Sequence, residues 1–166
     1  RAHLSLLPPL ADARLISFPP MRRGEAEAVL RRAVARYFLG GDLPRVVGVL
    51  AGGRGSRATG AGGPVPVLAA AAPLAVLEAA RGALGVVGWR VDSFTAAQGG
   101  WLEAASPLRG TAPAAVVVVV EEEVHLMRLE QGVPVAVRQL PAGDAAAVVG
   151  ALGPGPGRAL VLAPPR

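Results

Sequence analysis

The sequence predicts an α/β fold in which a mixed β-sheet is flanked by helices. Strand-like and helix-like stretches follow one another in the order β-β-α-β-β-α-β-α-β-β-β-α-β, and this order mixes hairpins with strand–helix units, as layered α/β proteins do. Apolar residues make up 52% of the chain, which is enough to build a packed core.

Length and composition narrow the possible functions. The 166 residues suit one ordinary domain or two small lobes. All 17 basic residues are arginines, and they are scattered along a chain whose formal net charge is only +5, so we expect no nucleic-acid partner. The absence of cysteine excludes disulfides, thiolate catalysis and cysteine-based metal sites.

The first 41 residues predict two short strands and a helix. Residues 3–7 and 15–18 are apolar stretches joined through Pro8 and Pro9, and together they suggest a β-hairpin. Residues 22–39 have apolar side chains at helical spacing, with glutamates early and arginines late, and Gly40 and Gly41 end the helix.

Residues 45–51 and 65–72 predict two strands that pair across the loop at residues 52–63. The loop contains a loose Gly-x-Gly-x-x-Ala pattern, but no helix follows it to bind phosphate and the chain has no lysine. We therefore interpret it as a flexible hairpin loop, in which Arg54 and Arg57 could contact an anion or an acidic partner.

The middle of the chain predicts two helices around a strand. Residues 74–87 form a helix that starts after Pro73 and ends at Gly88, with apolar anchors at Leu74, Leu77, Leu84 and Val87. Residues 89–95 alternate as a strand, residues 101–103 belong to a second helix, and residues 106–113 link two lobes.

The last third gives the most specific pattern. Five consecutive valines at residues 116–120 predict an interior strand buried on both faces. Residues 124–129 and 133–140 alternate on either side of Gln131–Gly132, which predicts a hairpin. A helix at residues 143–152, a turn at 153–157 and a strand at 159–163 complete the chain.

Few residues are candidates for a catalytic or metal-binding role. Glu121, Glu122 and Glu123 could suggest a metal or acid–base site, but consecutive strand residues point to opposite faces, so a solvated turn or strand end is favoured. Asp92 and Asp144 are expected to be structural, the latter as a helix cap. His125 is expected to be an ordinary strand residue. We therefore predict no catalytic residue and no metal site.

Three stretches, taken in order, resemble a known family. They are LISFPPM at residues 15–21 before a charged helix ending in ARYF, LGVVGWRVDS at residues 84–93, and VAVRQLPAG at residues 135–143. They are similar to PilM-like proteins of type IV pilus assembly and to the cytoplasmic domain of the type II secretion protein GspL. Both have an actin-like, or ribonuclease-H-like, fold.

The resemblance implies a truncated or degenerate actin-like fold. Residues 1–105 would be a partial first lobe, 106–113 a linker and 114–166 a shortened second lobe with the β-hairpin. The family's early Asp-Ile-Gly phosphate turn would precede Arg1, and its second phosphate turn falls at Glu121–Glu123. Carboxylates there repel a triphosphate unless a metal bridges them, so no cofactor is expected and ATP is disfavoured.

The implied function is a non-catalytic bacterial scaffold, cytoplasmic and peripheral to the inner membrane. It would bind a cytoplasmic segment of an inner-membrane pilus or secretion assembly protein, and a homo-oligomer is also compatible. The apolar stretches are too short to span a bilayer. Two alternatives remain open: an active actin-like ATPase, and an unrelated α/β binding module.

Overall fold

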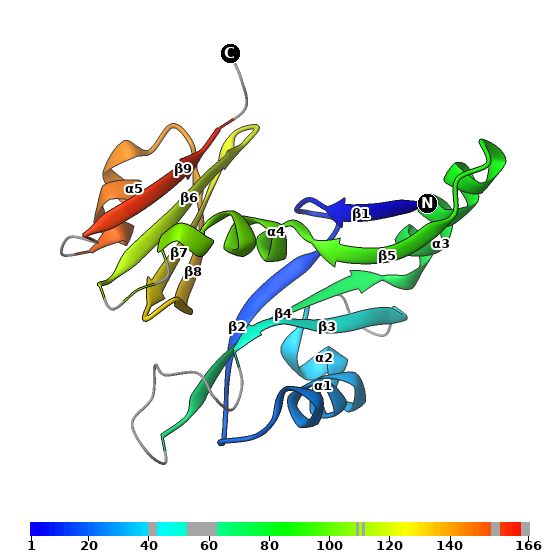
Figure 1. Cartoon of the computed structure of the whole chain (residues 1–166), viewed down its shortest axis with the longest axis horizontal. Coiled ribbons are helices and arrows are strands. Elements are labelled where there is room, and N and C mark those ends of the chain that lie inside the picture. The colour runs from blue at the N-terminus through cyan, green and yellow to red at the C-terminus, as the bar shows by residue number, and fades with distance from the viewer. Residues whose placement is uncertain (40–42, 53–62, 109, 111, 154–156, 164–166) are drawn as a thin grey trace.

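The computed structural model describes residues 1–39, 43–52, 63–108, 110, 112–153 and 157–163. Their strands form three sheets with helices packed between and around them (Figure 1). The elements are β1 (Ala2–Leu6), β2 (Asp12–Phe18), α1 (Arg23–Arg32), α2 (Val34–Tyr37), β3 (Arg45–Gly52), β4 (Val65–Pro73), α3 (Leu74–Val86), β5 (Val91–Ala96), α4 (Ala97–Ala104), a 3₁₀ turn (Ser106–Leu108), β6 (Ala114–Val120), β7 (Glu123–Glu130), β8 (Val133–Pro141), α5 (Ala145–Leu152) and β9 (Arg158–Leu162).

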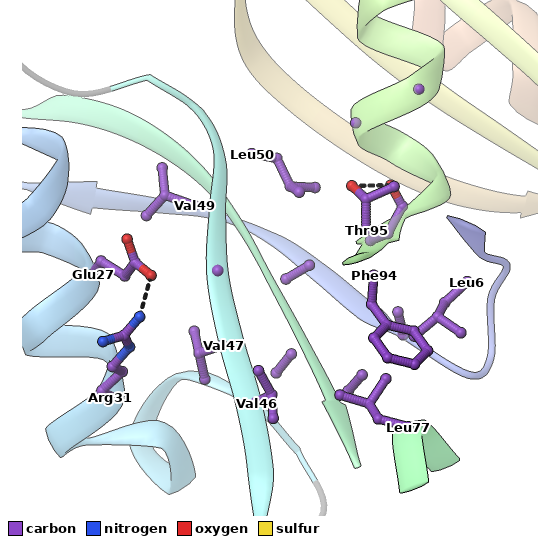
Figure 2. Close-up of a pocket in the computed structure, with 18 of the residues that line it drawn as sticks. Leu6, Glu27, Arg31, Val46, Val47, Val49, Leu50, Leu77, Phe94 and Thr95 are labelled. Atoms are coloured by element: carbon purple, nitrogen blue, oxygen red, sulfur yellow. Dashed lines mark hydrogen bonds and ion pairs between the residues drawn. The ribbon is translucent and has the colours of Figure 1, made fainter. Parts of the chain in front are cut away.

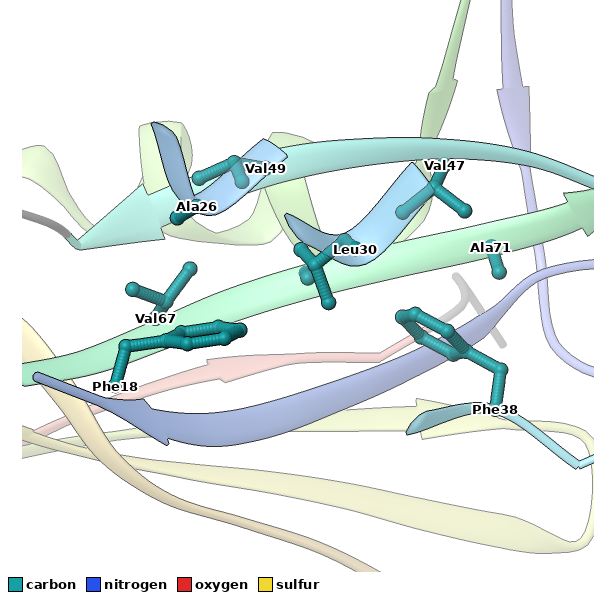
Figure 3. Packing of buried hydrophobic residues seen from close by; sticks show 9 residues of the cluster. Phe18, Ala26, Leu30, Phe38, Val47, Val49, Val67 and Ala71 are labelled. Carbon is teal, nitrogen blue, oxygen red and sulfur yellow. The ribbon is translucent and has the colours of Figure 1, made fainter. Parts of the chain in front are cut away.

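One antiparallel sheet has the strand order β2-β4-β3. The predicted pairing of β3 with β4 is confirmed, and residues 53–62 between them lie outside the described part of the chain. Alternate residues of β4 serve opposite faces: Val67, Ala69 and Ala71 belong to the cluster beneath α1, whereas Leu68, Ala70 and Ala72 pack on the other side. Figure 3 shows Leu30 of α1 lying over the first face, between Phe18 and Phe38.

The helix predicted at residues 22–39 is two helices. The backbone leaves helical geometry at Ala33 (φ −131°, ψ 40°), between α1 and α2. No glycine or proline marks this break in the sequence. Its effect is to bring Phe38, only 2% exposed, into the same cluster as Leu30.

The predicted hairpin between residues 3–7 and 15–18 is wrong. β1 pairs in parallel with β5, and β2 pairs antiparallel with β4, so the two strands belong to different sheets. Alternation in a short strand indicates which face is buried but not which strand lies beside it. The connection through Pro8 and Pro9 redirects the chain instead of closing a hairpin.

The strand predicted from residue 89 begins only at Val91. Trp89 belongs to the end of α3, because its N–H donates to the carbonyl of Leu84 (2.9 Å) while the Gly88 N–H donates to Gly85 (3.0 Å). With Gly88 at φ 81°, this is a Schellman cap. Val87, predicted as an apolar anchor, is 67% exposed, and of the four predicted anchors only Leu77 is buried.

The four-stranded sheet has the order β8-β7-β6-β9. β6 lies inside it, antiparallel to β7 and parallel to β9, so the predicted interior strand is confirmed. Of the five valines predicted to be buried, those at residues 116–118 are buried, whereas Val119 and Val120 at the end of the strand are half-buried. The β7–β8 hairpin also matches its prediction. Its turn residues Gln131 (φ 52°) and Gly132 (φ 77°) are both left-handed, as the two-residue hairpin turn that follows strand twist requires.

Helices cover the two faces of this sheet. α5 packs Ala151 against Leu126 on one face. On the other, Leu102 and Ala105 share a cluster with Val116 and Met127 of the sheet and Leu68 of β4. α4 therefore connects the two main sheets through one core, although the division into lobes at residues 106–113 remains a prediction.

Candidate functional site

A groove of about 730 Å³ runs along β3. We call it the β3 groove. Figure 2 shows Glu27 and Arg31 of α1 on one side of β3, and Leu6, Phe94 and Leu77 on the other. Three layers thus meet here: the α1 layer, the edge of the β2-β4-β3 sheet, and the β1–β5 pair with α3 and α4. Its lining residues are Leu6, Ala11, Arg23, Glu27, Arg31, residues 46–50, residues 70–72, Leu77, residues 94–96, Gly99, Gly100 and Glu103.

The floor of the β3 groove is a free strand edge. Among the described residues, β3 has one hydrogen-bonded neighbouring strand, β4. The guanidinium of Arg23 donates from Nη2 to the carbonyl of Val49, so this carbonyl points away from β4. Because backbone groups alternate sides along an antiparallel strand, the N–H and C=O of Val47 point to the same free edge. A side chain of α1 therefore already occupies a position that an added strand would pair with.

The groove walls are mainly small or apolar. Gly48 has no side chain in the strand, and a Cβ built on it or on Gly100 would meet nothing within 4 Å. The Glu27 and Arg31 side chains pair at 2.6 Å across one helical turn. The formal charges of the lining, two arginines and two glutamates, balance. The groove thus offers a ligand backbone hydrogen bonds and apolar contacts, and its electrostatic potential is not dominated by one sign of charge.

The glutamate run lies in the β6–β7 turn and does not converge on one point. Glu121 and Glu122 occupy the turn, Glu121 at φ 53°, and all three side chains are exposed. Glu123 starts β7, and its Oε2 accepts a hydrogen bond from Nε2 of Gln139 across the hairpin (2.6 Å). The predicted turn is confirmed. Within the described residues no group of three acidic or histidine side chains is arranged to hold a metal ion.

His125 is a strand residue, as predicted, and the structure shows in addition that it is buried. It is 4% exposed, and its Nε2 lies 3.5 Å from Oε2 of Glu123, an ion-pair distance without hydrogen-bond alignment. Burial lowers the pKa of His125, and the nearby Glu123 carboxylate opposes this only in part. The imidazole is therefore held mainly in its neutral form.

A second cavity, of about 360 Å³, lies beside His125. Gln98 of α4 also lines it, with Oε1 buried and without a hydrogen-bond partner in the described structure. Opposite them are Asp12 and Arg14 of β2, which pair at 3.0 Å. No pattern in the sequence indicates this cavity, since its walls come from five separate segments of the chain.

The isolated acids have structural roles, as predicted. Asp92 pairs with Arg90 (3.0 Å) and Arg1 (3.6 Å). Oδ1 of Asp144 accepts from the N–H of Ala147 (2.8 Å) and caps α5. The predicted contacts of Arg54 and Arg57 fall outside the described residues.

One side-chain pair in the structure has no signal in the sequence. Nδ1 of His3 and Oγ of Ser93 lie 2.7 Å apart across the parallel β1–β5 pair. Such a pair can activate a serine nucleophile only with an orienting acid and an oxyanion-binding pocket. Both side chains are exposed here, and no described hydrogen bond adds an acid to the imidazole, so the contact has the character of a cross-strand link.

The β3 groove was not predicted either. The one sequence signal is Gly48 between the valines of β3, because an interior glycine often marks close approach of another backbone. The opposite wall comes from β1, α3, β5 and α4, which lie before and after β3 in the chain, and their placement is not encoded locally.

None of the helices in the described part of the chain is both long and apolar enough to cross a membrane. No protein-family model matches the sequence, and no curated protein matches it.

Comparison with solved structures identifies the architecture. The chain is similar to a structure described as the PilM–PilN type IV pilus biogenesis complex (19% identity, TM-score 0.59, 92% of this chain and 47% of that chain). It is also similar to the cytoplasmic domain of EpsL, an inner-membrane component of the type II secretion system of Vibrio cholerae (12% identity, TM-score 0.58, 98% of this chain and 62% of that one).

A third similar structure, from Bacteroides thetaiotaomicron, is described as a protein with an actin-like ATPase fold and unknown function (8% identity, TM-score 0.51, 92% of this chain and 53% of that one). At these identities the likeness establishes the fold, which is actin-like as the sequence resemblance implied. The chain spans about half to three fifths of the length of these solved chains.

Proposed function

We propose that this actin-like chain is a non-catalytic scaffold of a type IV pilus or type II secretion assembly. In this role it binds a cytoplasmic segment of an inner-membrane partner in the β3 groove, working at the cytoplasmic face of that membrane. The observation that carries the proposal is the groove itself, whose floor is an unpaired strand edge.

The fold supports a role in a type IV pilus or type II secretion assembly. Two of the similar structures are described as components of type IV pilus biogenesis and type II secretion. One of these is a complex with a second protein, and the other is the cytoplasmic part of an inner-membrane component. A chain of the same fold with a groove at a strand edge fits a role in holding an assembly together.

The free edge of β3 supports binding of an extended peptide. An extended peptide adds to such an edge through main-chain hydrogen bonds, while pockets for alternate side chains select its sequence. The backbone groups of Val47 and the carbonyl of Val49 are available for that pairing, the latter by displacement of Arg23. Leu6, Leu77 and Phe94 supply the apolar wall for one side of the peptide.

A peptide titration tests the proposal. The probes are fluorescently labelled synthetic peptides that cover the cytoplasmic segments of the inner-membrane proteins encoded beside this chain, and binding is followed by anisotropy. Gly100→Trp is the groove variant, because Gly100 lines the groove and its Cβ position is open. Gly150→Trp in α5 is the matched control, since its Cβ position is equally open and lies outside the groove.

We expect one peptide to bind the wild type and Gly150→Trp equally, and Gly100→Trp at least about tenfold more weakly, a loss of about 1.4 kcal/mol. Equal binding to all three proteins would show that the peptide does not bind in the β3 groove. Failure of every neighbouring segment to bind would reject the scaffold proposal.

A further inference from the structure

The end of α3 and the turn into β5 carry an apolar surface that the core does not use. Val86, Val87 and Trp89 are 88%, 67% and 52% exposed. They follow one another closely at a single turn, which we call the α3 tip. In Figure 1 this tip forms the upper right corner of the molecule, at the end opposite the four-stranded sheet.

The α3 tip is held in a defined shape. The backbone hydrogen bonds from Trp89 to Leu84 and from Gly88 to Gly85 close the Schellman cap, and Gly88 adopts the positive φ that this cap needs. This turn exposes two valines and an indole to water. Polar side chains would be hydrated more favourably at these positions. The sequence nonetheless places one of its two tryptophans there.

Basic side chains surround the base of the tip. Arg90 follows Trp89 directly, and Arg1 lies beside it because the Ala2 N–H donates to the Arg90 carbonyl (2.8 Å). Against these two arginines stands one carboxylate, Asp92, which pairs with both Arg90 and Arg1. The surroundings of the tip are therefore net positive.

We propose that the α3 tip inserts into the surface of an anionic lipid bilayer. Indole rings favour the membrane–water interface, and arginines beside an apolar turn are attracted to anionic headgroups. A protein partner fits the shape less well, because a stable interface takes roughly 20–30 residues from each side and a convex turn of three apolar residues supplies far fewer.

The contact would be weak and reversible, since a few interfacial side chains do not anchor a protein on their own. Its consequence is that the protein has a defined orientation relative to the bilayer. α3 and β5 also form one wall of the β3 groove through Leu77 and Phe94. A bilayer at the tip would therefore lie at the far end of the elements that wall the groove, beside any segment that emerges from the membrane. The bilayer contact itself requires no occupant of the groove.

Vesicle binding tests the proposal without any partner protein. The probes are phosphatidylcholine vesicles with about 30% phosphatidylglycerol, and vesicles of phosphatidylcholine alone. The tip variant is Val87→Ser with Trp89→Ser. The matched control is Val149→Ser in α5, because Val149 has the same exposure as Val87, 67%, on another face.

We expect the wild type and Val149→Ser to cosediment with anionic vesicles, and the tip variant to bind about fivefold less. Binding should fall in about 0.5 M salt, where exposed charges are screened. Equal binding by the tip variant, equal binding to the neutral vesicles, or no binding by the wild type would each overturn the proposal.

Tryptophan fluorescence gives a second readout that does not depend on the stability of the serine variant. Trp101→Phe leaves Trp89 as the single indole, since the chain has two tryptophans. Its emission should shift to shorter wavelength with anionic vesicles, and an unchanged spectrum contradicts insertion. The tip variant should retain peptide binding in the β3 groove, which separates this proposal from the scaffold function.

Discussion

The imidazole of His125 packs against the indole of Trp101, with ring centroids 5.3 Å apart and ring planes inclined by 45°. Trp101 belongs to α4 and His125 to β7, so the contact joins the helix between the two main sheets to the four-stranded sheet. The buried histidine is consequently part of the packing between these layers, and its protonation state bears on their stability.

We expect the protein to lose stability as the pH falls below the ordinary histidine pKa of 6.5. Because the pKa of His125 is lowered in the folded state, the unfolded chain binds the proton first. The contribution is therefore fully present above pH 6.5 and is lost as the pH falls toward and through the lowered pKa. Thermal unfolding midpoints measured between about pH 7.5 and 5 would show the decline.

His125→Gln is the control for this pH dependence, because other groups also titrate in acid. Glu123, Gln98, Gln139 and Arg138 surround the imidazole, and all stay in place in this variant. The difference in unfolding midpoint between the variant and the wild type should shrink as the pH falls. Parallel curves would show that His125 is not the group responsible.

Val118→Asp should prevent soluble folding. Val118 is 5% exposed in the interior strand β6, and an unpaired carboxylate there costs more than about 3 kcal/mol. Val161→Asp in the neighbouring strand β9 is the matched control, since Val161 is 63% exposed. Soluble yield and the unfolding midpoint are the measurements, and an unchanged midpoint for Val118→Asp contradicts the buried placement.

Gly132→Ala should destabilise the β7–β8 hairpin by about 1–2 kcal/mol, because an alanine is strained at φ 77°. Gln131→Asn should raise stability by roughly 0.5 kcal/mol, since asparagine tolerates the left-handed conformation better. Denaturant unfolding measures both changes. Gly48→Ala is the comparison, because Gly48 has an open Cβ position and no positive φ; a similar loss there would show that the turn geometry is not the cause.

Titration calorimetry with Mg-ATP should give at best weak binding, and an assay for released phosphate should show no hydrolysis. Glu121, Glu122 and Glu123 place three exposed carboxylates where the actin-like phosphate turn is expected, and they repel a triphosphate. Glu122→Ala removes one of them and serves as the comparison. A micromolar dissociation constant that is lost in Glu122→Ala would favour the ATPase alternative over the scaffold.

Local patterns in the sequence were enough to predict several elements in their correct places. The Gln131–Gly132 turn sets the register of β7 and β8, because a two-residue loop leaves one way to pair the flanking strands. The five valines of β6 predicted an interior strand for a similar reason, since a strand without a polar face must be covered on both sides. The cap at Asp144 is local as well.

Contacts between distant segments could not be predicted from local patterns. The parallel pairing of β1 with β5, the contact of Trp101 with His125 and the β3 groove all join segments that are far apart in the chain. The alternation of apolar and polar residues and the strand propensity indicate which face a segment buries. They do not indicate its neighbour, because each short strand can pair with many others equally well. The choice among those partners depends on how all the layers pack at once, and the groove and the α3 tip are consequences of that packing.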